Sequence, residues 1–216
     1  MEEIKIGNQI WTSFNLSVEQ FANGELIQEA SSYEDWKYCG LNQIPAYCSY
    51  ENKQENEKVY GKLYNWFAVD DKRGLAPIGW QIPSLEDYIE LLNFLEPEKD
   101  PIYSNFFTPY TSLGTKLKSI NGWLDNNGVS GNGNNSSGFN GLPGGSRIGS
   151  FGDMGRYANF WCSSSRDDEH AHDLVLYYQG SHVSIGLGAN KECGFSVRCL
   201  KFESQIAMKP TNTNSV

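Results

Sequence analysis

The chain has 216 residues, a formal net charge of −9 and a pI near 4.8. Phosphate binding needs a clustered basic surface, and the 17 Lys and Arg residues are dispersed, so the composition argues against a nucleic-acid partner. No apolar run reaches the roughly 20 residues that span a bilayer, so we expect no membrane insertion. The first residues, MEEIKIGNQIW, lack the basic and apolar regions of a secretory signal, so none is predicted.

The composition also bears on the number of domains. Six Trp, 12 Tyr, 11 Phe and 22 Gly favour short strands joined by long ordered loops. No interior segment resembles a solvated linker. We therefore expect one domain over residues 1–203 and a polar tail over residues 204–216, which is either loose or ordered by an assembly partner.

Three segments of the N-terminal half allow an assignment. The pattern from Lys5 to Leu16 predicts a strand. Residues 51–58, ENKQENEK, alternate acid and base without an apolar face, which predicts a solvated loop. Residues 60–69, YGKLYNWFAV, are dense in aromatic side chains without clear periodicity, so they indicate either a short buried helix or a strand.

The clearest element is a helix from Leu85 to about Leu95. Ser84 can cap its first turn together with Asp87, three positions later. An apolar stripe with helical spacing follows, made of Tyr88, Leu91, Leu92 and Leu95. We expect this stripe to pack on the core.

Residues 127–147, NGVSGNGNNSSGFNGLPGGSR, are dominated by Gly and Asn. A Walker loop would need GK[ST] where GGSR stands. No acidic residue lies between Asp125 and Asp153 to complete a calcium-binding nonapeptide repeat. The run therefore predicts a long irregular loop held by turns.

Residues 174–187, LVLYYQGSHVSIGL, predict a β-hairpin that turns at Gln179 and Gly180. With a two-residue loop, one face is core-like and carries Leu174, Leu176, Tyr178, Val183, Ile185 and Leu187. The opposite face has the composition of a binding surface and carries Asp173, Val175, Tyr177, His182 and Ser184.

All three histidines, His170, His172 and His182, lie close together in the sequence. A shared metal site would need His172 and His182 on one face, which a three-residue loop allows and a two-residue loop does not. We favour ligand contact or surface exposure for the histidines, and we predict no metal and no cofactor. The five cysteines leave buried free thiols and one or two disulfides equally open.

Several sequence blocks follow one another along the chain: IGNQIWTSFNL, FANGELI, AYCSY, YGKLYNWFAVDDKRGLAPIGWQIPSLEDY, GTKLKS, SGFNGLPGGSR, FWCSS and GFSVRCLKF. Over about residues 6–202 they resemble the motifs of the Fibrobacter succinogenes major paralogous domain. More distantly, GWQIPSLEDY, PGGSR and GFSVRC are similar to motifs of formylglycine-generating-type domains. The resemblance implies an α+β, C-type-lectin-like fold: a mixed sheet where the termini meet, one clear helix and long irregular loops.

The resemblance also implies a location and a binding region. Family members sit in secreted or surface-attached bacterial proteins, often lipoproteins, so an extracellular or cell-surface location is expected. In C-type-lectin-like proteins of bacteria and phages, the segment before the closing GFRC-like strand commonly forms the ligand surface. The matching segment here is residues 163–188.

We therefore predict a non-catalytic recognition or adhesion module that binds a glycan or protein ligand at a bacterial cell or virion surface. The predicted ligand-binding residues are Ser164, Arg166, Asp168, His170, Asp173, Tyr177, His182 and Ser184. Two alternatives stay open, a metal-dependent oxidoreductase of formylglycine-generating type and a structural module of a surface assembly. The oxidase motif itself does not match, because its copper-binding cysteine pair lies upstream of the GFRC-like strand, whereas Cys193 and Cys199 straddle GFSVR.

Overall fold

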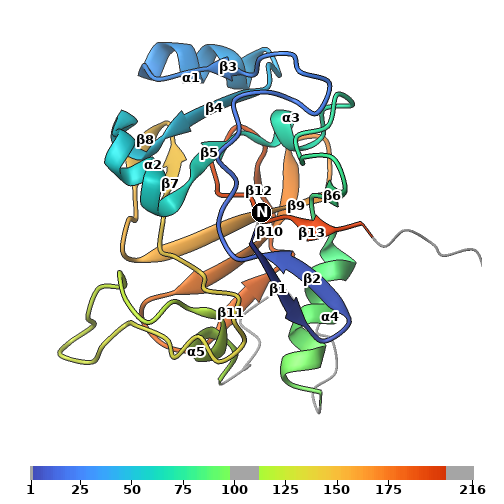
Figure 1. Cartoon of the computed structure of the whole chain (residues 1–216). Coiled ribbons are helices and arrows are strands. Elements are labelled where there is room, and N and C mark those ends of the chain that lie inside the picture. Colours follow the sequence, from blue (N-terminus) through green and yellow to red (C-terminus); the bar gives the residue numbers. More distant parts are fainter. Residues whose placement is uncertain (1, 98–111, 203–216) are drawn as a thin grey trace, which may run out of the picture.

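Residues 2–97 and 112–202 are described in the computed structural model of the chain, and they confirm the predicted α+β class (Figure 1). The helices are α1 (Tyr33–Leu41), α2 (Gln54–Tyr60), α3 (Trp66–Val69), α4 (Leu85–Leu95) and α5 (Leu113–Leu117), with a 3-10 turn at Tyr50–Asn52. The strands are β1 (Glu3–Ile6), β2 (Gln9–Thr12), β3 (Gln28–Glu29), β4 (Ala46–Ser49), β5 (Lys62–Tyr64), β6 (Trp80–Gln81), β7 (Ser146–Ile148), β8 (Ser150–Gly152), β9 (Tyr157–Ser165), β10 (His170–Tyr177), β11 (Val183–Ile185), β12 (Ala189–Asn190) and β13 (Leu200–Lys201). The expected tail, residues 204–216, lies outside the described residues.

The first and last strands share one antiparallel sheet in the order β1-β2-β13-β6. Leu200 of β13 pairs with Trp11 of β2 on one side and with Gln81 of β6 on the other. The expectation that the two ends of the fold meet in one sheet is therefore confirmed. A second, mixed sheet joins β3 in parallel and β5 in antiparallel orientation to β4.

The two longest strands, β9 and β10, run between the upper part of Figure 1, with α1, α2 and α3, and the lower part, with α4 and α5. One edge of β10 pairs with β9, and the other pairs with β11 and then β12. Leu176 pairs with Val183, a register centred on Gln179 and Gly180 as predicted, although residues 178–182 lie outside both strands, so the connection is longer than the two-residue loop. The predicted hairpin is thus confirmed, and all three of Leu174, Leu176 and Val183 are buried. Leu187, expected on the same face, is instead 38% exposed.

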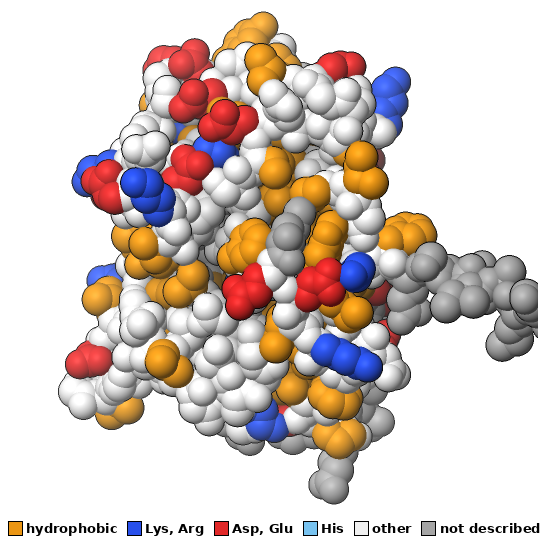
Figure 2. Space-filling model, in the orientation of Figure 1, with side chains coloured by type: hydrophobic (Ala, Val, Ile, Leu, Met, Phe, Trp, Pro, Cys, Tyr) orange, Lys and Arg blue, Asp and Glu red, His pale blue; other side chains and the backbone are white. Residues whose placement is uncertain are grey.

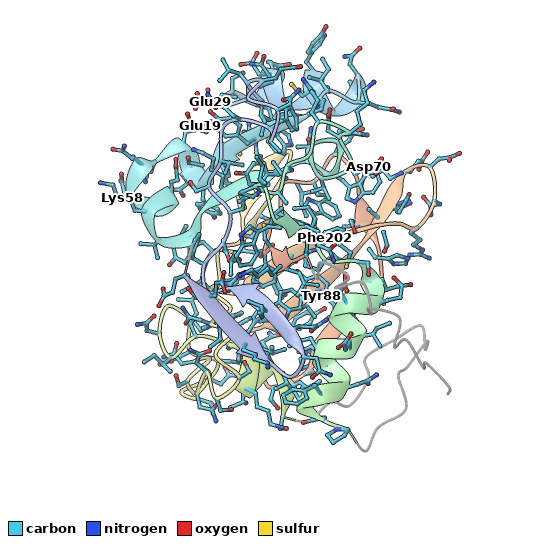
Figure 3. All side chains as sticks on the ribbon, turned by 45° about the vertical axis from the view of Figure 1, so that its right-hand side comes forward. Glu19, Glu29, Lys58, Asp70, Tyr88 and Phe202 are labelled. Atoms are coloured by element: carbon cyan, nitrogen blue, oxygen red, sulfur yellow. The ribbon has the colours of Figure 1, made fainter. Side chains whose placement is uncertain are left out.

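Helix α4 has the bounds that the sequence predicts. Ser84 Oγ accepts from the Asp87 N–H, and Asp87 Oδ2 accepts from the Ser84 N–H, which completes a capping box. The helix buries Tyr88, Leu91 and Leu92 against the core that also contains Trp11 and Leu176. Figure 3 shows Tyr88 on the side of α4 that faces the sheet. No helix in the described part of the chain is both long and apolar enough to cross a membrane.

Replacing Ser84 with alanine is expected to lower the free energy of unfolding by about 1 kcal/mol, the usual cost of losing an N-cap. The first turn of α4 would lose the acceptor for the Asp87 N–H while the apolar stripe stays intact. Urea denaturation measures the change, with Ser136→Ala at an exposed loop position as the control. Equal stability of the Ser84→Ala and Ser136→Ala proteins would contradict the cap.

Two local predictions are wrong. The segment from Lys5 to Leu16 is not one strand but the β1–β2 hairpin, because Gly7 takes a φ of 62° and turns the chain. Residues 54–60 form α2 rather than a solvated loop. Glu57 of α2 accepts from Ser17 and Ser49 and pairs with the buried Lys62 ammonium at 2.7 Å, so one side chain ties the polar helix to the fold.

The Gly- and Asn-rich segment is an irregular ordered loop, as predicted. Main-chain bonds hold it, among them Gly133 N–H to Ser119 O and Gly141 N–H to Leu117 O. The left-handed backbone at Asn127, Asn135 and Asn140 explains why Asn recurs there, since Asn tolerates that region.

Candidate functional site

The eight predicted ligand-binding residues fall into two groups at opposite ends of β10. His170 pairs with Asn190 at one end, and Tyr177 pairs with Tyr157 at the other. Eight strand residues separate the ends by roughly 23 Å, at about 3.3 Å per residue. The residues therefore do not form a single site, and each end has to be considered separately.

At the Tyr177 end, three half-buried rings lie side by side, one on β9, one on β10 and one on the residue that precedes β11. The Tyr177 ring meets Tyr157 edge-on at a centroid distance of 5.4 Å and stacks on His182 at 4.5 Å. The Tyr177 hydroxyl donates to Ser184 Oγ at 2.8 Å. We call Tyr157, Tyr177 and His182 the aromatic row.

The middle of the same sheet face is closed. Val175, Asn159 and Ser184 are 9%, 9% and 4% exposed. Ser184 was predicted to contact ligand from an open face. The predicted exposure of Ser184 is wrong, because the residue is buried and its hydroxyl accepts a hydrogen bond from Tyr177.

The far end of this face is also closed, which corrects the predicted exposure of Asp173. Asp173 is 5% exposed and pairs with Trp161, whose ring packs on Phe195 at 4.5 Å. The Gly188 N–H bonds to the Asp173 carboxyl from the loop after β11. The segment that leads from β11 toward β13 thus covers Asp173, which the hairpin alternation had placed on the solvent-exposed face.

Burial shifts the titration of three residues on this face. It raises the pKa of Asp173 to about 7, with the Gly188 N–H acting in the opposite direction. It raises the pKa of Tyr177, although the bond to Ser184 opposes the change. It lowers the pKa of His182, and the positive charge of Lys118 adds to that effect. At neutral pH Tyr177 and His182 are therefore uncharged.

The second group surrounds the β9–β10 turn. Arg166 and Asp168 are exposed, and Arg166 Nη1 donates to the Leu187 carbonyl. His170 Nδ1 lies 2.9 Å from Asp167 Oδ1. Ser164 Oγ accepts from the Leu85 N–H, so its hydroxyl serves the first turn of α4.

Sequence reasoning missed Tyr157 and Asn159. Both lie on the same face of β9 as Trp161, which is visible in the alternation of YANFW, residues 157–161. That alternation would have identified Tyr157 as a surface aromatic once β9 was paired with β10.

The arginines of the two most recognisable motifs are structural. Arg147, from PGGSR, is 2% exposed, donates to Ala30 O and Ser32 O at 2.6 Å each, and stacks between Trp36 and Phe151. Arg198, from GFSVRC, is fully buried and donates to three main-chain carbonyls and to Asn15. These motifs therefore stabilise loops and contribute no guanidinium to a surface site.

The histidines and cysteines were the candidates for metal binding and for disulfide bonds. Within residues 2–97 and 112–202, no group of three His, Cys, Asp or Glu side chains is placed to hold a metal ion. His172 and His182 face opposite sides of the hairpin in the observed register. All five cysteines are free and buried. Burial raises the pKa of Cys193 and Cys199 to about 12, so both are protonated thiols at neutral pH.

The chain thus has an α+β fold in which the first and last strands share one sheet. The arginines of its PGGSR and GFSVRC motifs are buried and donate hydrogen bonds to main-chain carbonyls. Residues 4–201 match the Fibrobacter succinogenes major domain family, and the chain belongs to this family. Among curated proteins and among solved structures, none matches the chain. Family membership by itself assigns no activity and no ligand.

Proposed function

We propose that the protein is a non-catalytic recognition module that binds a glycan or a protein ligand through the aromatic row. The observation that carries the proposal is the arrangement of Tyr157 on β9, Tyr177 on β10 and His182 just before β11, with ring contacts at 5.4 and 4.5 Å. Such rings offer flat apolar area with hydrogen-bonding edges and lose little side-chain entropy on binding.

The surroundings of the row suit a neutral or weakly polar ligand. Tyr177 and His182 carry no charge at neutral pH, since burial raises the pKa of Tyr177 and lowers that of His182. Figure 2 shows a face of the molecule on which no histidine is visible, and there too the Lys and Arg side chains are scattered among acidic ones. Stacking against a sugar ring or a peptide side chain is thus the interaction this surface supports best, rather than anion capture.

We also propose the C-type-lectin-like fold and a place at a bacterial cell or virion surface. The meeting of β2 and β13 in one sheet and the long ordered loop over residues 118–145 support the fold. A ligand bound at the Tyr177 end of β10 would then contact part of residues 163–188, the segment to which the resemblance assigns ligand binding. Within the described residues, no observation favours the alternative of a metal-dependent oxidoreductase.

Alanine at His182 or Tyr177 is expected to lower ligand binding at least about tenfold, because each change removes a ring from the stacked row. Binding of purified protein to glycan and cell-surface arrays measures the effect, and circular dichroism verifies the fold. Tyr38→Ala, at a 61% exposed tyrosine on α1, is the matched control. Array binding that survives both row substitutions would rule out this site.

A further inference from the structure

Lys118, the residue after α5, is 2% exposed, and its ammonium binds main-chain carbonyls from two loops. Nζ donates to Gly131 O at 2.6 Å in the Gly- and Asn-rich loop. It also donates to Gly180 O at 2.8 Å and to Tyr177 O at 3.1 Å in the β10–β11 turn. The Trp123 ring lies beneath it at 5.1 Å.

The protonation state of Lys118 determines whether all three bonds can exist. A lysine ammonium has three N–H donors, and three carbonyls use them here. A neutral amine has only two donors, so one buried carbonyl would lose its partner. Across the described residues Lys118 has no ion pair with a carboxylate, so no acidic side chain would retain the proton.

Two of the three carbonyls that Lys118 binds, Tyr177 O and Gly180 O, belong to the end of β10 and to the turn after it, which joins two members of the aromatic row. Tyr177 precedes the turn and His182 follows it. The turn is also docked on α5 by a bond from the Gly114 N–H to Ser181 O at 2.7 Å. A Cβ at Gly114 would lie 2.7 Å from that oxygen, so the approach requires glycine. Main-chain contacts to Gly114 and Lys118 thus help to position the turn, together with the bond from the Tyr178 N–H to Arg156 O at 2.9 Å.

We propose that protonated Lys118 clamps the β10–β11 turn in the position that forms the aromatic row, and that loss of its proton releases the turn. The proposal rests on the proposed function only in treating the aromatic row as the ligand surface. The clamp itself is a property of the protein without ligand.

The electrostatic surroundings support a release just above neutral pH. Burial lowers the pKa of Lys118 to about 8. Among the described residues, His182 lies across the turn, and its pKa is lowered first by burial and in part by the Lys118 charge. The other elements packed against Lys118 contribute carbonyl oxygens and the Trp123 ring.

A second buried lysine at the other end of the sheet provides the matched control. Lys191 Nζ donates to Asp167 O at 2.8 Å and Asp168 O at 3.2 Å, above the Trp66 ring at 4.4 Å. It therefore holds the β9–β10 turn by the same kind of contacts. Lys191→Met should loosen residues 165–170 and leave the β10–β11 turn unchanged.

Hydrogen exchange of the full chain, followed by mass spectrometry and corrected for intrinsic rates, tests the clamp. In the wild type, protection of residues 176–184 should fall at least about tenfold between about pH 7 and about pH 9.5. In Lys118→Met, protection of this segment should be low at every pH. The wild-type pH series remains decisive if that variant fails to fold.

Protection that is constant with pH in the wild type would overturn the clamp. The same holds if Lys191→Met loosens residues 176–184 as much as Lys118→Met does. No ligand is added in these measurements, so array binding that survives the Tyr177 and His182 substitutions would count against the proposed function alone.

Discussion

Replacing Arg198 with methionine is expected to lower the free energy of unfolding by about 4 kcal/mol or more. Arg198 is fully buried, and the described structure gives its guanidinium no carboxylate partner. Burial lowers its pKa to about 10, so the group is still charged at neutral pH. Within the described residues, its charge is compensated by oxygen dipoles and by the faces of the Phe139 and Phe160 rings.

The loss is large because Arg198 joins segments that are distant in the sequence. Nη1 donates to Thr12 O at 2.9 Å and Phe139 O at 2.7 Å, while Nη2 donates to Asn15 Oδ1 at 2.9 Å. The guanidinium also lies 4.7 Å from the Phe139 ring. Methionine fills much of the volume but leaves these buried oxygens without a donor, which costs about 1–3 kcal/mol for each unsatisfied group.

Urea denaturation at neutral pH measures this effect. Arg156→Met removes an exposed guanidinium, 6.0 Å from the Tyr178 ring, and should change stability by no more than about 0.5 kcal/mol. Arg198→Lys keeps a charge with fewer donors and should fall between the two. An Arg198→Met protein as stable as Arg156→Met would show that the oxygens find other partners, and the structural role would be wrong.

Local signals predicted several elements because the interactions that form them are close in sequence. The helix from Leu85 to Leu95 follows from the reciprocal Ser84–Asp87 cap and an apolar stripe with helical spacing. The β10–β11 hairpin follows from alternation on either side of Gln179 and Gly180. In both cases neighbouring residues carry the information.

Elements that depend on distant partners could not be predicted in this way. Helix α2 has no buried residue, and it is held by Glu57, which pairs with Lys62 and accepts from Ser17. Helix α1 has a Ser32 cap but only a weak apolar stripe, and Trp36 is anchored by a bond to Glu192 O. Such contacts join residues that no local pattern relates.

The site shows the same limit. Alternation placed Asp173 and Tyr177 on one face correctly, but it could not show that the chain returning toward β13 covers Asp173. Proximity in sequence grouped His170 with His182, although β10 separates them by roughly 23 Å at about 3.3 Å per residue. Tyr157 was missed because its neighbour Tyr177 is contributed by a different strand.

Asparagine at Asp173 is expected to stabilise the protein at alkaline pH and to leave it almost unchanged near pH 4. Burial raises the pKa of Asp173 from an ordinary 3.8 to about 7. Between these values the folded chain holds a proton that the unfolded chain has released. The contribution of this group to stability therefore falls as pH rises through about pH 7, and the loss is complete above about pH 8.

The size of the effect follows from the shift. Three pKa units correspond to about 4 kcal/mol as an upper value, since one unit is about 1.4 kcal/mol. Asparagine cannot ionise, and its amide oxygen can still accept from the Gly188 N–H that bonds Asp173. The difference in unfolding free energy between Asp173→Asn and the wild type should thus grow with pH and level off above about pH 8.

Urea denaturation at several pH values between about 4 and 9 would measure this difference. Other titrating groups act equally on both proteins and cancel in the comparison. Asp168→Asn, at an exposed position on the β9–β10 turn, should show no such growth. If the Asp173→Asn difference is the same at every pH, Asp173 ionises in the folded protein as it does in water, and its carboxyl must reach solvent despite the chain that covers it.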